Sequence, residues 1–340
     1  MFDFAIKEDE MFDFAIKIEG LAKAFGDIQA LSNVNLRVPA GSIIVLLGRN
    51  GAGKTATVNI LTTLTQPDAG TAEVAGFDTV TQAQRVRARI GVAGQGTTLD
   101  LMLTGRQNLE IIGRLYHLGG AQARERTEEL LTEFGLTGAA DRAVKTYSGG
   151  MRRRLDLAAS LLPDPQVLFL DEPTSGLDPI SRARMWQTVR DHAARGTTIL
   201  LTTQDMEEAN ELADRIVVLA GGVIVATGTP AELAAATGDP RIRVALPEAK
   251  PLLLRRVQAL LGPGAETRGR VVTGPAPDGL TTLASVVEKL TDIDIEVHDV
   301  GFEHPTLNEV FTRLTADPAE ATVYDNAKRA GRLHLVATAA

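Results

Sequence analysis

The segment that most constrains the fold is residues 48–55, Gly-Arg-Asn-Gly-Ala-Gly-Lys-Thr, which directly follows an apolar run at 42–47. The pattern G-x-x-x-x-G-K-[ST] after a buried strand predicts a tight turn into a helix, with several backbone N–H groups pointing to one place. Gly48, Gly51 and Gly53 carry no side chain, so a polyphosphate can approach the backbone there. A turn that merely favours glycine is the weaker interpretation, because strand, spacing, Lys and Thr are all present.

Specific roles follow for two side chains of this loop. Lys54 is expected to reach the β- and γ-phosphates of a nucleoside triphosphate, and the Thr55 hydroxyl to ligate Mg²⁺. The predicted nucleotide-contacting residues of the loop are Gly48, Arg49, Asn50, Gly51, Ala52, Gly53, Lys54, Thr55 and Ala56.

A second cluster ends the apolar run 167–171, where Asp171 and Glu172 follow each other. At the carboxyl edge of a parallel sheet, Asp171 would lie near a bound Mg²⁺, and Glu172 would orient or deprotonate an attacking water. Acidic residues also end many strands without any such role. The presence of the glycine-rich loop favours the catalytic interpretation.

A third segment, residues 147–154, joins a Ser-Gly-Gly triplet to three arginines. Ser148 is a suitable helix N-cap, and Gly149 and Gly150 allow backbone N–H groups to approach an anion. Positive charge in a first helical turn is unfavourable against the helix dipole, so the arginines predict a nearby polyphosphate that offsets it. A solvated basic helix start is the alternative.

The order of elements predicts an α/β domain with a mainly parallel sheet. Runs at 167–171, 197–202 and 215–219 are typical of buried strands, and helices are expected near 180–194 and 205–214. Short alternating runs before residue 42 predict an antiparallel β edge. Helical spacing of apolar residues at about 101–163 predicts a helical insertion in the sheet domain.

After residue 236 the pattern restarts and predicts a small α+β domain over 237–316, with a split βαβ arrangement. Strands are expected at 241–246, near 271–272 and at 293–297. The expected helices are 251–261, 280–290 and 305–314, and 317–340 is a tail. Residues 1–7 recur as 11–17, so residues 1–10 are interpreted as a duplicated N-terminal extension.

Composition excludes several classes of function. The chain has 340 residues, a net charge of −8 and 0 cysteines. The acidic balance argues against a nucleic-acid partner, and the absence of cysteine excludes disulfides and thiolate chemistry. No apolar stretch reaches the ~18–20 residues that a membrane span needs. If the protein works at a membrane, another chain must supply the spans.

Taken in order, these motifs resemble the nucleotide-binding domain of ABC ATPases over about residues 12–235. The resemblance implies ATP and Mg²⁺ as cofactors and a homodimer that closes around two ATP. It also implies nucleotide contacts by residues of the signature loop, an adenine-stacking aromatic and an aspartate across the dimer: Phe25, Tyr147, Ser148, Gly149, Gly150, Met151 and Asp178. It implies hydrolysis through Glu172 with Gln95 and Gln204, and Mg²⁺ ligation by Thr55, Gln95 and Asp171.

Three positions depart from the usual family pattern. Gln204 stands where a switch histidine is usual, and it can donate a hydrogen bond but cannot carry a proton at this position. Arg49 replaces a proline, and Ala56 replaces a threonine whose hydroxyl usually helps to bind the α-phosphate. Together with Gln204, the segments 94–95, 147–160 and 305–311 make the chain similar to ATPase subunits of the daunorubicin-resistance type of drug exporter.

That resemblance implies an export motor that drives a separate membrane permease at the cytoplasmic face of the membrane. The alternatives are a soluble ABC ATPase without a permease, and an importer ATPase with a regulatory C-terminal domain. A binding-only protein is disfavoured because Lys54, Asp171 and Glu172 are all present. The cargo is not encoded in these motifs, so a drug, an antibiotic and a lipid-like compound stay open.

Overall fold

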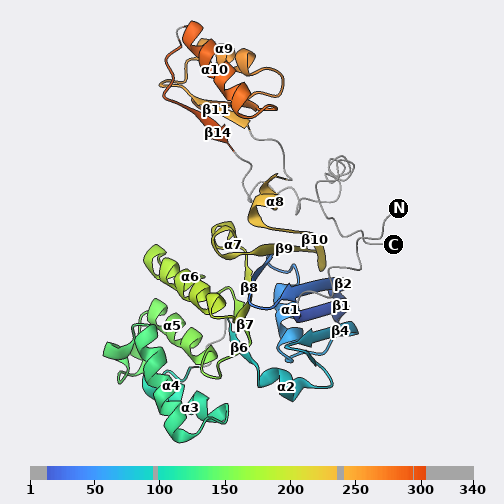
Figure 1. Ribbon diagram of the computed structural model, residues 1–340, viewed down its shortest axis with the longest axis vertical. Coiled ribbons are helices and arrows are strands. Elements are labelled where there is room, and N and C mark those ends of the chain that lie inside the picture. The colour runs from blue at the N-terminus through green and yellow to red at the C-terminus, as the bar shows by residue number, and fades with distance from the viewer. Residues whose placement is uncertain (1–13, 95–98, 236–240, 294, 304–340) are drawn as a thin grey trace. The chain divides into compact units, whose positions relative to one another are not determined.

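The computed structural model describes residues 14–94, 99–235, 241–293 and 295–303 (Figure 1). The chain divides into two units, one ending at Thr229 and the other beginning at Pro230. The predicted domain boundary at 236–237 falls on residues outside the described ranges, as do the duplicated N-terminal extension, the expected helix 305–314 and the tail.

The centre of the first unit is a six-stranded sheet in the order β10-β9-β3-β8-β7-β6. Neighbouring strands from β9 to β6 are parallel, and only β10 pairs antiparallel among these described strands. β3 and β7 are buried along their whole length, as expected for parallel strands covered on both faces. The bounds are β3 Ile43–Leu47, β6 Ile90–Ala93, β7 Val167–Asp171, β8 Thr198–Thr203, β9 Arg215–Ala220 and β10 Val223–Gly228.

The predicted antiparallel edge forms a separate sheet in the order β2-β1-β4-β5. Its buried side chains alternate with exposed ones along β2, so one face joins the core shared with β3 and α1. The bounds are β1 Phe14–Phe25, β2 Ile28–Pro39, β4 Ala69–Val74, β5 Phe77–Asp78, α1 Lys54–Leu61 and α2 Ala83–Arg87.

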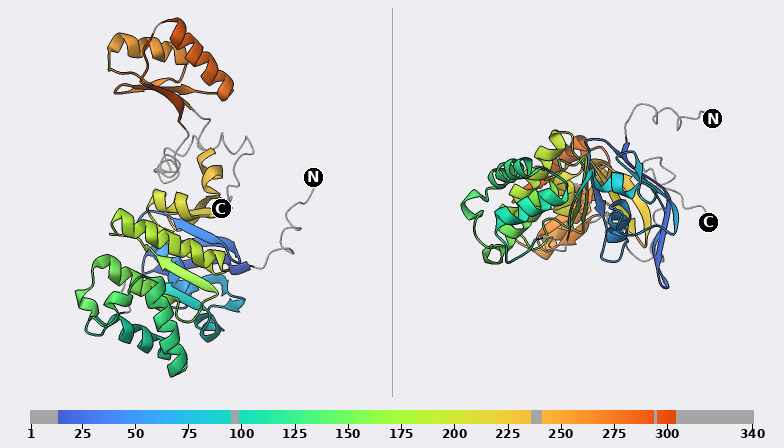
Figure 2. Two further views of the ribbon diagram at one scale, coloured as in Figure 1. Left: turned by 60° about the vertical axis from the view of Figure 1, so that its left-hand side comes forward. Right: turned by 90° about the horizontal axis from the view of Figure 1, so that it is seen from below.

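A helical insertion follows β6 and returns to the sheet at β7, as the sequence predicts. It comprises α3 Gly105–Leu115, α4 Gly120–Glu133 and α5 Gly149–Ser160, with short 3₁₀ turns at Thr137–Ala139 and Val144–Thr146. Figures 1 and 2 show these helices gathered at one side of the first unit, away from β1, β2 and β4. We use the name helical insertion for α3–α5 and their connections.

The helical insertion begins at a capping box and touches the sheet closely. Thr104 and Gln107 exchange hydrogen bonds at the start of α3. At Gly91 in β6 a Cβ atom would lie 2.1 Å from the backbone carbonyl oxygen of Ser160, so α5 contacts bare sheet backbone there. Two more helices pack on the sheet after β7: α6 Pro179–Ala194 and α7 Met206–Leu212.

The second unit has the β-α-β-β-α-β order of a split βαβ arrangement. The arrangement agrees with the prediction, but the short strand at 266–268 was not expected. Its sheet runs β12-β13-β11-β14 with antiparallel pairs throughout, and one apolar core joins it to α9 and α10. The expected strand at 293–297 is wrong: α10 ends at 292 and the strand forms at 299–303, where it pairs with β11. The bounds are α8 Pro230–Ala235, β11 Arg241–Ala245, α9 Pro251–Leu261, β12 Glu266–Arg268, β13 Val271–Pro275, α10 Leu280–Asp292 and β14 Asp299–Glu303. None of the helices in the described ranges is both long enough and apolar enough to cross a bilayer.

Candidate nucleotide-binding and hydrolysis site

The glycine-rich loop connects β3 to α1, and two of its glycines adopt positive φ, 82° at Gly51 and 107° at Gly53. A Cβ atom at Gly53 would lie 2.5 Å from the carbonyl oxygen of Ala30, and one at Gly48 would lie 2.7 Å from that of Leu219. Both positions therefore exclude a side chain. The glycines fit the close backbone approach that a polyphosphate cradle needs.

Lys54, the first residue of α1, is only 6% exposed and turns back over this loop. Its Nζ donates to the carbonyl oxygens of Gly48 at 2.7 Å and Arg49 at 3.2 Å, and lies 3.7 Å from Oε1 of Glu172. Burial lowers the pKa of Lys54, and the carboxylates of Glu172 and Asp171 oppose that shift. The predicted loop and the predicted acidic pair are thus parts of one cluster.

Sheet order explains why these residues meet. β8 lies between β3 and β7, so Leu47 pairs with Thr203 and Asp171 pairs with Thr202 at the same carboxyl edge. The Thr202 hydroxyl donates a short hydrogen bond to the Asp171 carboxylate and so fixes its orientation. Sequence reasoning missed Thr202, whose only signal is its place at the end of a buried strand.

Glu172 has an unusual backbone for a residue with a side chain, with φ of 49°. Its N–H donates to the carbonyl oxygen of Thr202 at 3.0 Å. Strained residues of this kind cost about 1–3 kcal/mol and cluster at functional sites. The strain supports the catalytic interpretation of Glu172.

A third carboxylate, that of Glu208 on α7, is 1% exposed. It accepts hydrogen bonds from the Thr174 hydroxyl at 2.7 Å and the Trp186 Nε1–H at 3.2 Å. Burial raises the pKa of Glu208. Glu208 thereby links the segment after Glu172 to α7. Gln204, which lies between β8 and α7, is exposed. Glu208 belongs to none of the predicted motifs.

The Ser-Gly-Gly segment starts α5. The Ser148 hydroxyl accepts from the Met151 N–H at 3.2 Å, so the predicted N-cap is confirmed. The Tyr147 side chain is buried and donates to the carbonyl oxygen of Ala139 at 2.7 Å, which directs it into the helical insertion. Asp178 caps α6, accepting from the Ser181 N–H and hydroxyl.

The arginine run departs from expectation. Arg153 donates to four backbone carbonyl groups, and Arg154 donates to that of Phe134 at 2.7 Å. Carbonyl groups of the same chain therefore offset the charges of Arg153 and Arg154, and a polyphosphate near these two residues stays a prediction. The sequence could not show this, since the carbonyls belong to distant segments.

The remaining predicted residues have varied surroundings. Phe25 is 49% exposed, with Lys23 Nζ 5.5 Å from its ring centroid. Ala56 packs in the apolar core, whereas Arg49, Asn50 and Thr55 are exposed and Ala52 is buried. Gln95 lies outside the described residues, so its predicted roles stay predictions.

The donor set suits a magnesium–nucleotide complex. Asp171 and Thr55 supply the hard oxygen atoms that Mg²⁺ prefers, and Mg²⁺ commonly keeps only one or two protein carboxylates together with substrate phosphates. The described part of the chain contains no group of three or more His, Cys, Asp or Glu that could enclose a metal ion.

Comparison with known proteins agrees with this geometry. The family model described as ABC transporter matches residues 31–175. The chain is 51% identical over 308 residues to the daunorubicin resistance ATP-binding protein DrrA3 of Streptomyces coeruleorubidus, covering 90% of this chain and 98% of that protein. The chain belongs to the ABC transporter ATP-binding subunits of the daunorubicin-resistance type. A doxorubicin resistance ATP-binding protein of Mycobacterium tuberculosis is 43% identical, with 92% of this chain and 97% of that protein covered.

Solved structures of ABC cassettes resemble the first unit. An ATP-binding subunit of an ABC transporter superposes with a TM-score of 0.60 at 26% identity, covering 64% of this chain and 91% of that one. A dimeric ATP-binding cassette in a post-hydrolysis state with ADP and phosphate superposes with a TM-score of 0.58 at 26% identity, covering 63% of this chain and 98% of that one. These relatives confirm the predicted fold class and the ATPase assignment.

Proposed function

We propose that this ABC ATPase is the motor subunit of an export system, and that it drives a separate membrane permease. The observation that carries the motor activity is the contact of Lys54 Nζ with Glu172 Oε1, 3.7 Å apart at the carboxyl edge of the sheet. Relatives named for daunorubicin and doxorubicin resistance support export of a drug, antibiotic or lipid-like compound. The subunit would lie at the cytoplasmic face of the membrane, held there by the permease.

In the proposed mechanism, two subunits close around two ATP. Backbone N–H groups of the loop and the Lys54 ammonium would hold the phosphates of ATP. The Lys54 charge would also stabilise the negative charge that develops while the γ-phosphoryl group is transferred to water. Asp171 and Thr55 would hold Mg²⁺, with Gln95 as a further ligand; the ion would neutralise phosphate charge. Ser148 and Gly149 of the partner subunit's copy would complete the site.

Glu172 would orient the attacking water and accept its proton, since its carboxylate is fixed beside Lys54. Gln204, exposed at the end of β8, would donate a hydrogen bond to the γ-phosphate. Phe25 would stack on adenine. Closure and hydrolysis would then move the permease and reset it.

Replacement of Glu172 by Gln tests the chemistry. We expect kcat for ATP hydrolysis to fall by about a hundredfold or more, because general base catalysis contributes about 10²–10⁴-fold. An ATP-dependent dimer should accumulate, measured by size-exclusion chromatography with light scattering. Glu129→Gln, an exposed carboxylate on α4, is the matched control and should retain wild-type turnover. Full turnover by the Glu172 variant would contradict the assignment.

Export needs a separate test. The chain is co-expressed with a candidate permease, and daunorubicin accumulation in cells is compared for the wild type and the Glu172→Gln variant. Lower accumulation with the wild type alone supports the exporter. Active ATPase that neither co-purifies with a permease nor changes accumulation favours the alternative of a soluble ATPase.

A further inference from the structure

The side chain of Arg153 joins the helical insertion to the hydrolysis site. Its Nε donates to the Pro173 carbonyl oxygen at 2.7 Å and its Nη1 to that of Gly94 at 2.6 Å. Its Nη2 donates to the carbonyl oxygens of Asp171 at 3.1 Å and Glu172 at 2.7 Å. One guanidinium therefore binds the end of β6 and the whole turn that follows β7.

The electrostatic setting explains why the charge is tolerated there. Arg153 stands near the N-terminus of α5, where the helix dipole disfavours a cation. Four carbonyl oxygens and the Asp156 carboxylate, 3.8 Å from Nη1 and 2% exposed, surround the guanidinium with negative potential. Its five donors form a rigid fork that can bind several acceptors at once, which an ammonium group cannot copy.

Glu172, the strained residue of the site, has its backbone held by hydrogen bonds on both sides. The Glu172 N–H is held by Thr202 of β8, and its carbonyl oxygen is held by Arg153 of α5. A left-handed backbone at a glutamate persists only where its surroundings over-determine it. Without Arg153, the turn can relax and carry the carboxylate away from Lys54.

We infer that Arg153 is a positioning residue for ATP hydrolysis, which holds the Glu172 backbone in its strained conformation. This inference rests on the proposed role of Glu172. Arg153 also binds the carbonyl oxygen of Gly94 just after β6, so one side chain connects the ends of two strands to the helix that starts at Ser148. A change in the position of α5 would thereby reach the hydrolysis site.

The four carbonyl acceptors of Arg153 all lie outside the phosphate-binding loop 48–55. A loss of positioning can therefore be told from a general loss of structure, which would also weaken nucleotide binding. Removing Arg153 should lower kcat and leave nucleotide affinity nearly unchanged. In Arg153→Met, we expect kcat at saturating ATP to fall by about tenfold or more, because small misplacements of catalytic groups can cost about 10²-fold. The Kd for ATP, measured by fluorescence titration, should stay within about threefold.

Two further variants accompany this one. Arg153→Lys keeps the charge but loses the fork, so its kcat should fall between Arg153→Met and the wild type; it decides the question if Arg153→Met does not fold. Arg190→Met is the matched control, because Arg190 also donates to a backbone carbonyl, that of Glu211 at 3.2 Å, but from the outer end of α6. Its kcat should equal the wild-type value.

A double-variant cycle gives the sharper readout. If Arg153 acts through Glu172, adding Arg153→Met to Glu172→Gln should lower single-turnover hydrolysis by less than about twofold. An equal loss in both backgrounds, or a kcat of Arg153→Met within about twofold of the Arg190 control, would overturn the inference. Failure of the proposed function is distinguishable, because the wild type would then hydrolyse no ATP or Glu172→Gln would remain fully active.

Discussion

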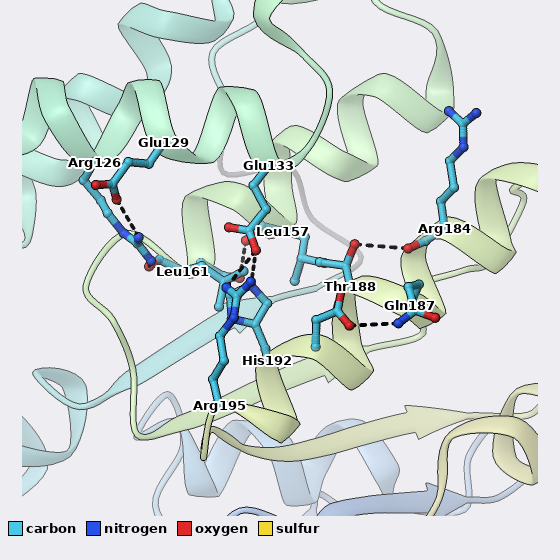
Figure 3. Close-up of polar contacts among 12 residues, drawn as sticks. Arg126, Glu129, Glu133, Leu157, Leu161, Arg184, Gln187, Thr188, His192 and Arg195 are labelled. Carbon is cyan, nitrogen blue, oxygen red and sulfur yellow. Dashed lines mark hydrogen bonds and ion pairs between the residues drawn. The ribbon is translucent and has the colours of Figure 1, made fainter.

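Two contacts between the helical insertion and the rest of the first unit differ in their chemistry. Near the hydrolysis site, Arg153 binds backbone carbonyl groups. At the other, Glu133 at the end of α4 contacts His192 Nε2 at 3.4 Å and Arg195 Nη1 at 2.9 Å, both from the end of α6 (Figure 3). We call the second contact the Glu133 cluster.

The difference lies in what can weaken each contact. A guanidinium keeps its charge at any pH at which proteins fold, and backbone carbonyls are neither titrated nor replaced by substitution. The Glu133 cluster depends on side chains, one of them a histidine, and Arg195 is 61% exposed to solvent. We therefore expect the contact at the hydrolysis site to be stiff and the Glu133 cluster to yield first.

The largest expected effect on stability comes from a substitution at the contact between β6 and α5, on the side of the helical insertion near the hydrolysis site. Gly91→Ala puts a Cβ 2.1 Å from the Ser160 carbonyl oxygen, so β6 or α5 must shift. Overpacking of this kind costs about 1–3 kcal/mol of unfolding free energy, measured by urea denaturation. Gly120→Ala at the start of α4 meets open space and should not destabilise. Equal stability of the two variants would refute the tight contact.

An intermediate effect is expected from Glu133→Ala. Removing the carboxylate should cost about 0.5–1 kcal/mol of unfolding free energy, because Glu133 is 26% exposed and the pair is partly screened. ATP turnover should change by less than about twofold, in contrast to Arg153→Met, since the Glu133 cluster does not touch Glu172. Glu129→Ala, which breaks an exposed pair on the same helix, should cost less. A turnover loss as large as that of Arg153→Met would break the comparison.

The smallest effect is a pH dependence of the Glu133 cluster. Burial lowers the pKa of His192, with Arg195 and Arg126 adding to this, while Glu133 and Asp191 oppose it. The unfolded chain then binds a proton more readily than the folded one, so this contribution to stability is complete above the ordinary value of about 6.5 and is lost as pH falls below it.

His192→Gln should remove this part of the pH dependence, measured as the melting temperature between about pH 7.5 and about pH 5.5. The control is His117→Asn, because His117 is exposed with φ of 62°, which asparagine tolerates. An unchanged slope in the His192 variant would assign the acid sensitivity to other groups.

Local chemistry made much of this protein predictable. The loop 48–55, the buried strand ending at Asp171 and the cap at Ser148 each follow from residues that are neighbours in sequence. The split βαβ arrangement of the second unit was also expected from the alternation of elements, although its short strand at 266–268 was not. Its last strand was misplaced because residues 293–297 have strand-like composition, whereas pairing with β11 selects 299–303.

The arginines show where sequence reasoning ends. At 152–154 they are three identical side chains in a row, and the sequence alone predicts one role for all. The structure directs Arg153 to the turn around Glu172 and Arg154 to Phe134. Thr202 and Glu208 were missed for the same reason, because their partners lie 31 and 34 residues away in the chain.

By itself the sequence predicted a polyphosphate-binding loop, a candidate site that includes Lys54, Asp171 and Glu172, and a helical insertion that interrupts the sheet. These properties depend on local backbone geometry and residue type. Only the tertiary structure decided which backbone groups hold the site in place. Hydrogen bonds to carbonyls carry no signature in the sequence, since every residue has a carbonyl and only the packing of α5 selects the four that Arg153 binds.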